Sequence, residues 1–149
     1  MTILHGMRVF ESSAFVALPL AGMQLAQMGA EVIRFDNLGG GLDHLRRPLA
    51  PNGESLFWHG LNKGKKSFAV NLKTEKGREL VTDLITSDGD DAGLFITNLR
   101  VAGWTDYESL KRKRADLIMV TLKGDRHGGP EVDYTVNPSL GIPHITGAE

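Results

Sequence analysis

The chain has 149 residues, a formal net charge of −1 at pH 7 and no cysteine. A chain of this length can bury a real core, so we expect one domain over residues 1–149. The balanced charge gives no support for a general polyanion-binding role, so we expect no nucleic-acid partner, and the lack of cysteine excludes disulfides, thiolate nucleophiles and cysteine-based metal sites.

No targeting or membrane segment is evident. Met1–His5 lacks the basic and apolar regions of a signal peptide. No apolar run approaches the ~20 residues that span a bilayer. We therefore expect a cytoplasmic protein without a membrane partner, which also suits a cysteine-free chain.

The first 36 residues predict a βαβ unit. Met7–Phe10 is a short apolar run typical of a buried strand, and Val32–Phe35 is a second one. Between them, Pro19 suits the first turn of a helix and Gly29 suits the position just after its end. The two strands should be parallel, with a right-handed crossover.

The turn after the first predicted strand argues against a dinucleotide site. Residues 12–18 read SSAFVAL and hold no glycine, whereas G-x-G-x-x-G is needed there for the backbone to approach a pyrophosphate. NAD and FAD are therefore disfavoured. Asp36, which ends the second strand, is either a ribose-binding acid or, as we prefer, a solvated strand end.

A long connection follows. Gly39, Gly40 and Gly41 suit a flexible turn better than a ligand cradle, and the proline and glycine breakers within Leu42–Gly60 predict a loop. Such long loops are usually functional or disordered. The sequence NKGKK at Asn62–Lys66 is either a solvated loop or a phosphate site built from lysine ammonium groups.

Strands and helices alternate in the rest of the chain. Further strands are predicted at Ser67–Leu72, Leu94–Thr97 and Leu117–Leu122. A helix is predicted at Thr74–Ile85, capped by Thr74, and its apolar face consists of Leu80, Val81, Leu84 and Ile85. A second helix is predicted at Tyr107–Lys113, capped by Asp106. Residues 132–149 contain too many breakers for one long helix. The fold class is α/β, with an open, mostly parallel, Rossmann-like sheet and flanking helices.

Position alone marks one binding edge. Open parallel sheets bind ligands at the carboxyl ends of their strands, which makes Asn98–Arg100 a candidate site. The five histidines are scattered without metal-binding spacing, so no metal site is expected.

The order of segments resembles the family III CoA-transferases, which include racemases and isomerases of acyl-CoA. The similar segments are MRVFE, LAQMGAEVIRFD, the glycines 39–41, LNKGKKSFAVNLKTEKGREL, LFITNLR and ADLIMVTLKG. The final stretch, VDYTVNPSLGIPHITG, resembles the branch that acts on mesaconyl-CoA and methylfumaryl-CoA, whose enzymes move CoA between two carboxyls of one C5 diacid. The resemblance implies a truncated large-domain fold of this family.

The resemblance also implies site residues. Positions matching CoA contacts of the family are Val16, Asn71, Leu72, Lys73, Asn98, Leu99, Arg100 and Lys123. Val16 stands where oxalate-type transferases carry glutamine. Asp133 is the catalytic candidate, since it matches an acidic position near the reaction centre. Racemases carry a histidine just before it, where this chain has Val132, so a transferase or isomerase is favoured.

Members of the family are much longer, and their nucleophilic aspartate lies downstream of the segment matching residues 132–147. The resemblance therefore implies CoA thioesters and a small carboxylic acid as substrates, no covalently bound cofactor, a homodimer, and no turnover by these 149 residues alone. Two alternatives stay open: a non-catalytic α/β module that binds CoA or another nucleotide, and a structural fragment without a ligand.

Overall fold

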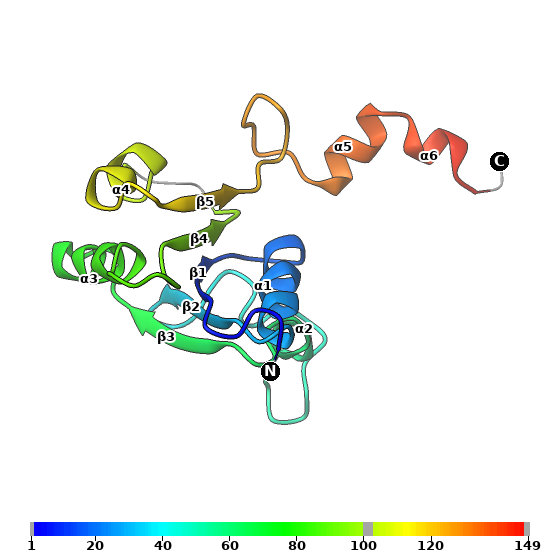
Figure 1. The fold of residues 1–149 in the computed structure, drawn as a ribbon. Coiled ribbons are helices and arrows are strands. Elements are labelled where there is room, and N and C mark those ends of the chain that lie inside the picture. Colours follow the sequence, from blue (N-terminus) through cyan, green and yellow to red (C-terminus); the bar gives the residue numbers. More distant parts are fainter. Residues whose placement is uncertain (1, 100–102, 148–149) are drawn as a thin grey trace.

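A computed structural model describes residues 2–99 and 103–147 (Figure 1). Its sheet has five strands in the order β3-β2-β1-β4-β5. The strands are β1 (Arg8–Ser12), β2 (Glu31–Asn37), β3 (Lys66–Val70), β4 (Leu94–Thr97) and β5 (Ile118–Thr121). Every neighbouring pair is parallel, so the predicted α/β class with an open parallel sheet is confirmed.

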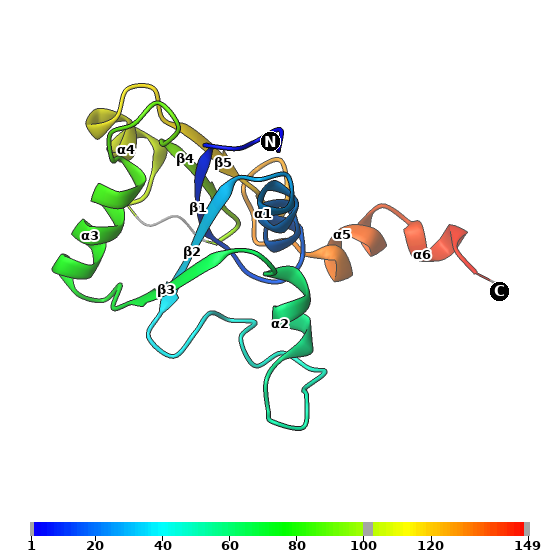
Figure 2. The ribbon, with the colours of Figure 1, turned by 60° about the horizontal axis from the view of Figure 1, so that its bottom comes forward.

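Helices cover both faces of this sheet. They are α1 (Ala17–Gln27), α2 (Leu56–Leu61), α3 (Glu75–Ile85), α4 (Tyr107–Lys113), α5 (Asp133–Ser139) and α6 (Ile142–Ile145). Helices α1 and α2 lie on one side, α3 and α4 lie on the other, and α5 and α6 extend away from the sheet (Figures 1 and 2). No helix in the described residues is long and apolar enough to cross a membrane.

Each face of the sheet has its own apolar core. Phe10, Phe35 and Phe95 point toward α3 and α4, within a cluster that includes Val81, Ile85 and Leu110 from those helices. Val9 and Val32 belong to a second cluster, with Leu18 from α1. Successive strand residues point to opposite faces, so these two layers follow directly from adjacent apolar residues in the short buried strands.

The predicted helix ends are confirmed. The Thr74 hydroxyl accepts a hydrogen bond from the Gly77 N–H at 3.1 Å, and Asp106 Oδ1 accepts one from the Ser109 N–H at 3.0 Å. Gly29, just after α1, has φ = 103°, a backbone conformation that glycine adopts without steric cost. These local signals therefore fix where three of the helices begin or end.

Two expectations about the helices were wrong. The predicted loop at Leu42–Gly60 ends in a helix, because the Ser55 hydroxyl caps the first turn of α2 by accepting from the Trp58 N–H at 3.0 Å. The apolar face predicted for α3 was too wide, since Leu80 is 50 % exposed whereas Val81 is fully buried.

Candidate functional site

The strand order creates a switch point between β1 and β4. The chain builds β1, β2 and β3 toward one edge of the sheet and then adds β4 and β5 on the opposite side of β1. The connections after β1 and β4 therefore leave in opposite directions, and such a point at the carboxyl ends of parallel strands is where open α/β sheets bind ligands. The turn over residues 13–16, called here the β1–α1 turn, lies at this point.

Asn98, which follows β4, bridges the switch point. Its side-chain Oδ1 accepts from the Ala14 N–H at 2.9 Å, and its Nδ2 donates to the Ala14 carbonyl at 2.8 Å. Asn98 and Leu99 thus lie at the predicted binding edge, although the amide of Asn98 is engaged by the protein itself. Arg100, the third residue predicted there, lies outside the described residues.

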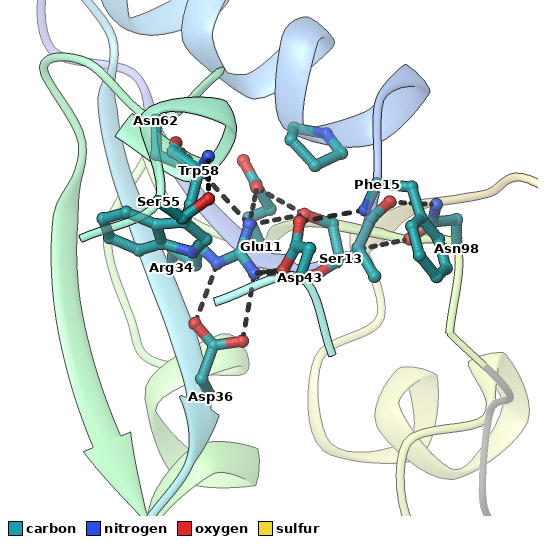
Figure 3. A network of polar contacts seen from close by, with 12 residues as sticks. Glu11, Ser13, Phe15, Arg34, Asp36, Asp43, Ser55, Trp58, Asn62 and Asn98 are labelled. Carbon is teal, nitrogen blue, oxygen red and sulfur yellow. Dashed lines mark hydrogen bonds and ion pairs between the residues drawn. The ribbon is translucent and has the colours of Figure 1, made fainter. Parts of the chain in front are cut away.

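Side chains from β2 and the following loop hold the rest of the β1–α1 turn (Figure 3). Arg34 Nη2 donates to the Ser13 carbonyl at 2.9 Å, and the Phe15 N–H donates to Asp43 Oδ2 at 2.9 Å. Arg34 also donates to Asp43 Oδ1 at 3.1 Å. In a dinucleotide fold, the backbone N–H groups of this turn would bind a pyrophosphate. Here the Ala14 N–H is bound by Asn98 and the Phe15 N–H by Asp43, so neither is free for a ligand.

Phe15 itself is held in an unusual conformation. Its φ is 66°, in the left-handed region that costs an L-residue other than glycine about 1–2 kcal/mol. Its ring lies beneath Arg46, whose guanidinium carbon is 5.3 Å from the ring centroid and 4.5 Å from the centroid of Phe57. Such strain persists only where the surroundings determine the conformation, and it concentrates at functional sites.

Arg34 is the centre of a buried polar network behind this turn. Its side chain is fully buried, it lies 2.8 Å from Asp36 Oδ2, and it donates to Asn62 Oδ1 at 3.1 Å. Asp36 is therefore not free to bind a ribose. The preferred expectation, a solvated strand end, was wrong as well, because Asp36 is buried and paired with Arg34. Desolvation opposes the charge of Arg34, but hydrogen bonds and attraction from Asp36, Asp43 and Glu11 outweigh it and raise its pKa.

Glu11 and Lys65 complete the network. β1 continues past the predicted end at Phe10 because Glu11 and Ser12 still pair with β4. Glu11 is fully buried, and Lys65 Nζ lies 2.7 Å from Glu11 Oε1. Lys65 also donates to the Pro19 carbonyl and to Asn62 Oδ1, each at 2.8 Å. Lys65 therefore fits neither reading of the NKGKK turn, since its buried, paired side chain belongs neither to a solvated loop nor to a free phosphate site. The next lysine, Lys66, pairs with Glu31.

This network has an unbalanced charge. It contains three acids (Glu11, Asp36 and Asp43) and two bases (Arg34 and Lys65). Burial is the main reason why the pKa of Glu11 is raised and that of Lys65 is lowered, although each partner's charge opposes the shift. Glu11 Oε2 has no hydrogen-bond partner among the described residues, so proton uptake by this carboxyl would remove the excess charge.

A pocket of about 330 Å³ opens at the carboxyl ends of β2 and β3. It is lined by Asn37, Leu38, Asn71 and Lys73. The Leu72 N–H donates to Asn37 Oδ1 at 3.3 Å, which ties the end of β3 to the end of β2. Lys73 is exposed and its ammonium can bind a phosphate as a point charge. Two of the predicted CoA contacts thus line one pocket, with Leu72 between them in the chain.

The remaining predicted residues lie elsewhere. Val16 is the N-cap residue of α1 and is 47 % exposed at the β1–α1 turn. Lys123 is exposed after β5, and Asp133 is exposed at the start of α5, which extends away from the sheet (Figure 2). Within residues 2–99 and 103–147, no hydrogen bond or ion pair joins Asp133 to the turn or the pocket, and its catalytic role stays a prediction.

The sequence reasoning missed Arg34, Asp43 and Glu11. A signal was available, because Arg34 interrupts the apolar run VIRF and Glu11 directly follows the apolar run of β1. Charged residues inside a buried strand are almost never left unpaired. In the same described residues, no group of three or more histidine or acidic side chains has a geometry that could hold a metal ion.

Comparison with known proteins places this geometry in a family. Residues 4–149 match the family model described as CoA-transferase family III. The 2-methylfumaryl-CoA isomerase of Chloroflexus aurantiacus is 62 % identical over 146 residues, which cover 97 % of this chain and 36 % of that protein. The succinate–glutarate CoA-transferase of Agrobacterium fabrum is 36 % identical, with 97 % of this chain and 39 % of that protein covered.

A solved structure of a related protein has the same fold. A CaiB/BaiF family protein from Brucella suis superimposes with a TM-score of 0.84 and 31 % identity, covering 98 % of this chain and 41 % of that one. The chain spans 36–41 % of the length of these three relatives. From the family match over nearly its whole length, the chain belongs to CoA-transferase family III.

Proposed function

We propose that this chain is the CoA-binding α/β part of an enzyme that moves CoA between the carboxyl groups of a short dicarboxylic acid, of the mesaconyl-CoA and 2-methylfumaryl-CoA type. The observation that carries the proposal is the 62 % identity to a 2-methylfumaryl-CoA isomerase, against 36 % to a succinate–glutarate CoA-transferase over the same share of this chain. Acyl-CoA and a carboxylate are the corresponding substrates.

The shape of the carboxyl edge supports a long ligand with two different ends. The pocket beside Lys73 is lined by Asn37, Leu38 and Asn71 and carries an exposed cation, which suits the phosphorylated nucleotide end of CoA. The switch point between β1 and β4 lies farther along the same edge, because β1 separates β2 from β4. A ligand that runs from the ends of β2 and β3 to the β1–α1 turn would bring its thioester to Val16 and Leu99.

The chemistry assigned to this chain is binding and orientation. Transfer of CoA between carboxyls through a covalent carboxylate intermediate divides one difficult step into easier ones, and it needs the thioester held at a fixed place. The ordered β1–α1 turn would supply such a place. Asp133 remains the proposed acid of this chain near the reaction centre, assisting rather than acting as the nucleophile.

Calorimetric titration with CoA tests the binding half of the proposal. We expect saturable binding that weakens as salt rises, because the phosphates are charged, and that weakens further in Lys73→Ala. Lys113→Ala is the matched control, since Lys113 is exposed in α4 and pairs with Asp83. Absence of heat and of any change in melting temperature at millimolar CoA would refute CoA binding.

Chromatography of the thioesters tests the reaction. Mesaconyl-CoA is incubated with the protein, and its C1 and C4 thioester isomers are separated and quantified. Interconversion of the isomers supports the isomerase assignment, whereas exchange only when a second carboxylic acid is added indicates a transferase between two acids. CoA binding with neither reaction indicates a binding part that needs the rest of a longer enzyme.

A further inference from the structure

We propose that Asp43, held by Arg34, is a positioning residue that sets the β1–α1 turn for the acyl end of a bound acyl-CoA. The proposal rests on the proposed function, because it assumes that the thioester lies at the switch point. It assigns a role to a residue that touches the turn and not the ligand. The Asp43 carboxylate is almost fully buried, so a structural role toward the chain is the one open to it.

The backbone of the turn is fixed from three separate elements. Arg34 on β2 donates to the Ser13 carbonyl, and Asp43 accepts from the Phe15 N–H. Asn98, after β4, accepts from the Ala14 N–H and donates to the Ala14 carbonyl. Four successive backbone groups are thus satisfied by side chains that come from distant parts of the sequence. Ser13 and Ala14 are each 1 % exposed, so water cannot replace these partners, and the shape of the turn depends on the three side chains.

Asp43 acts on the strained residue of this turn. A left-handed backbone at Phe15 is unfavourable on its own, and the carboxylate offsets it by accepting the Phe15 N–H at 2.9 Å. Arg34 holds that carboxylate through its other oxygen at 3.1 Å. Hydrogen bonds to charged groups are the strong ones. Loss of the carboxylate would therefore let Phe15 return to ordinary conformations and move Val16, the next residue.

The position of Val16 matters because it begins α1 at the switch point. It is the N-cap residue of an 11-residue helix, and 47 % of its surface is exposed. The ring of Phe15, stacked beneath Arg46, ties the loop that carries Asp43 to the same turn. The loop over residues 38–55 thereby acts on the acyl end of the ligand, whereas the pocket beside Lys73 acts on the nucleotide end.

The test compares two probes in one variant. Mesaconyl-CoA reaches both ends of the site, and adenosine 3′,5′-bisphosphate reaches the nucleotide end alone. In Asp43→Asn we expect the Kd of mesaconyl-CoA to rise about tenfold, because the competent turn falls to about a tenth of the population. The Kd of the bisphosphate should stay within about twofold, since its pocket does not contain Asp43.

Controls separate positioning from folding. Asp116→Asn is the matched control, because Asp116 is 75 % exposed before β5 and pairs with Arg114; both Kd values should be unchanged. If Asp43→Asn fails to fold, Asp43→Glu keeps the charge beside Arg34 while displacing the acceptor, and the same split between the two probes is expected. Circular dichroism confirms that each variant is folded before titration.

Each result has a distinct meaning. Equal weakening of both probes, or no weakening of either, overturns the positioning role and leaves the proposed function standing. A wild-type chain that binds neither probe overturns the proposed function, and the positioning role falls with it. Selective weakening of mesaconyl-CoA supports the role, because a merely structural contribution would not distinguish the two ends of one ligand.

Discussion

Replacing Lys65 by methionine should destabilise the fold far more than the same change at the adjacent Lys66. The side chain of Lys65 is 1 % exposed and its ammonium faces the fully buried Glu11, whereas the side chain of Lys66 is 70 % exposed. Breaking a buried pair from one side costs roughly 3–5 kcal/mol, since it leaves an uncompensated charge. An exposed pair contributes about 0–1 kcal/mol. Glu11 can take up a proton when Lys65 is lost, so we expect a cost near the lower end, about 3 kcal/mol.

Urea unfolding followed by circular dichroism at pH 7 measures both variants. The double variant Lys65→Met with Glu11→Gln should recover most of the loss, because it removes both buried charges together. Equal destabilisation by the two lysine changes would refute the reasoning. So would a double variant no more stable than Lys65→Met alone, since the buried charge of Glu11 would then not be the cause.

Three further predictions use the same measurement. Burial raises the pKa of Glu11, so the contribution of Glu11 to stability is full below the ordinary pKa of a glutamate and is lost as the pH rises through the raised pKa. Across this pH window, the stability of the wild type should fall relative to that of Glu11→Gln. Parallel curves of stability against pH would contradict this. Gly22→Ala should cost about 1–3 kcal/mol by overpacking, because the added Cβ would lie 1.8 Å from Glu11 Oε2; an unchanged unfolding midpoint would show that Glu11 can move aside. Val81→Ala should cost about 2 kcal/mol and Leu80→Ala less than about 0.5 kcal/mol, given their opposite exposure on α3; similar costs would contradict the packing described for that helix.

Local signals were sufficient for the five strands and their parallel arrangement, but not for the order of the strands in the sheet. The alternation of short apolar runs with capped helices predicted five strands in a parallel sheet, and the strand Leu94–Thr97 agrees at both ends with the structure. Thr74, Asp106 and Gly29 act through hydrogen bonds or backbone angles within a few residues, which is why sequence patterns reveal them. Family resemblance then led to the family that the comparisons show.

The polar network was beyond such signals. Whether Lys65 faces solvent or Glu11 depends on two residues that lie 54 positions apart, and nothing near Lys65 in the sequence distinguishes it from Lys66. The same holds for Asp43, which reads as one more polar residue in a long loop until the fold brings it to Phe15. Ser55 was a missed local signal, since a serine N-cap before an apolar run is a recognisable helix start.

The Asn98 bridge also makes the shape of the β1–α1 turn depend on the docking of β4. Asn98 and Ala14 are 84 positions apart in the chain, and contacts of such long range form slowly because the entropy of loop closure is lost before packing compensates for it. The β1–α1 turn cannot take its final shape until β4 has docked beside β1. A nascent or partly unfolded molecule that holds β1, β2 and β3 together would therefore carry the pocket beside Lys73 without a formed turn. Such an intermediate would keep the end of the site proposed for the nucleotide and lack the end proposed for the thioester.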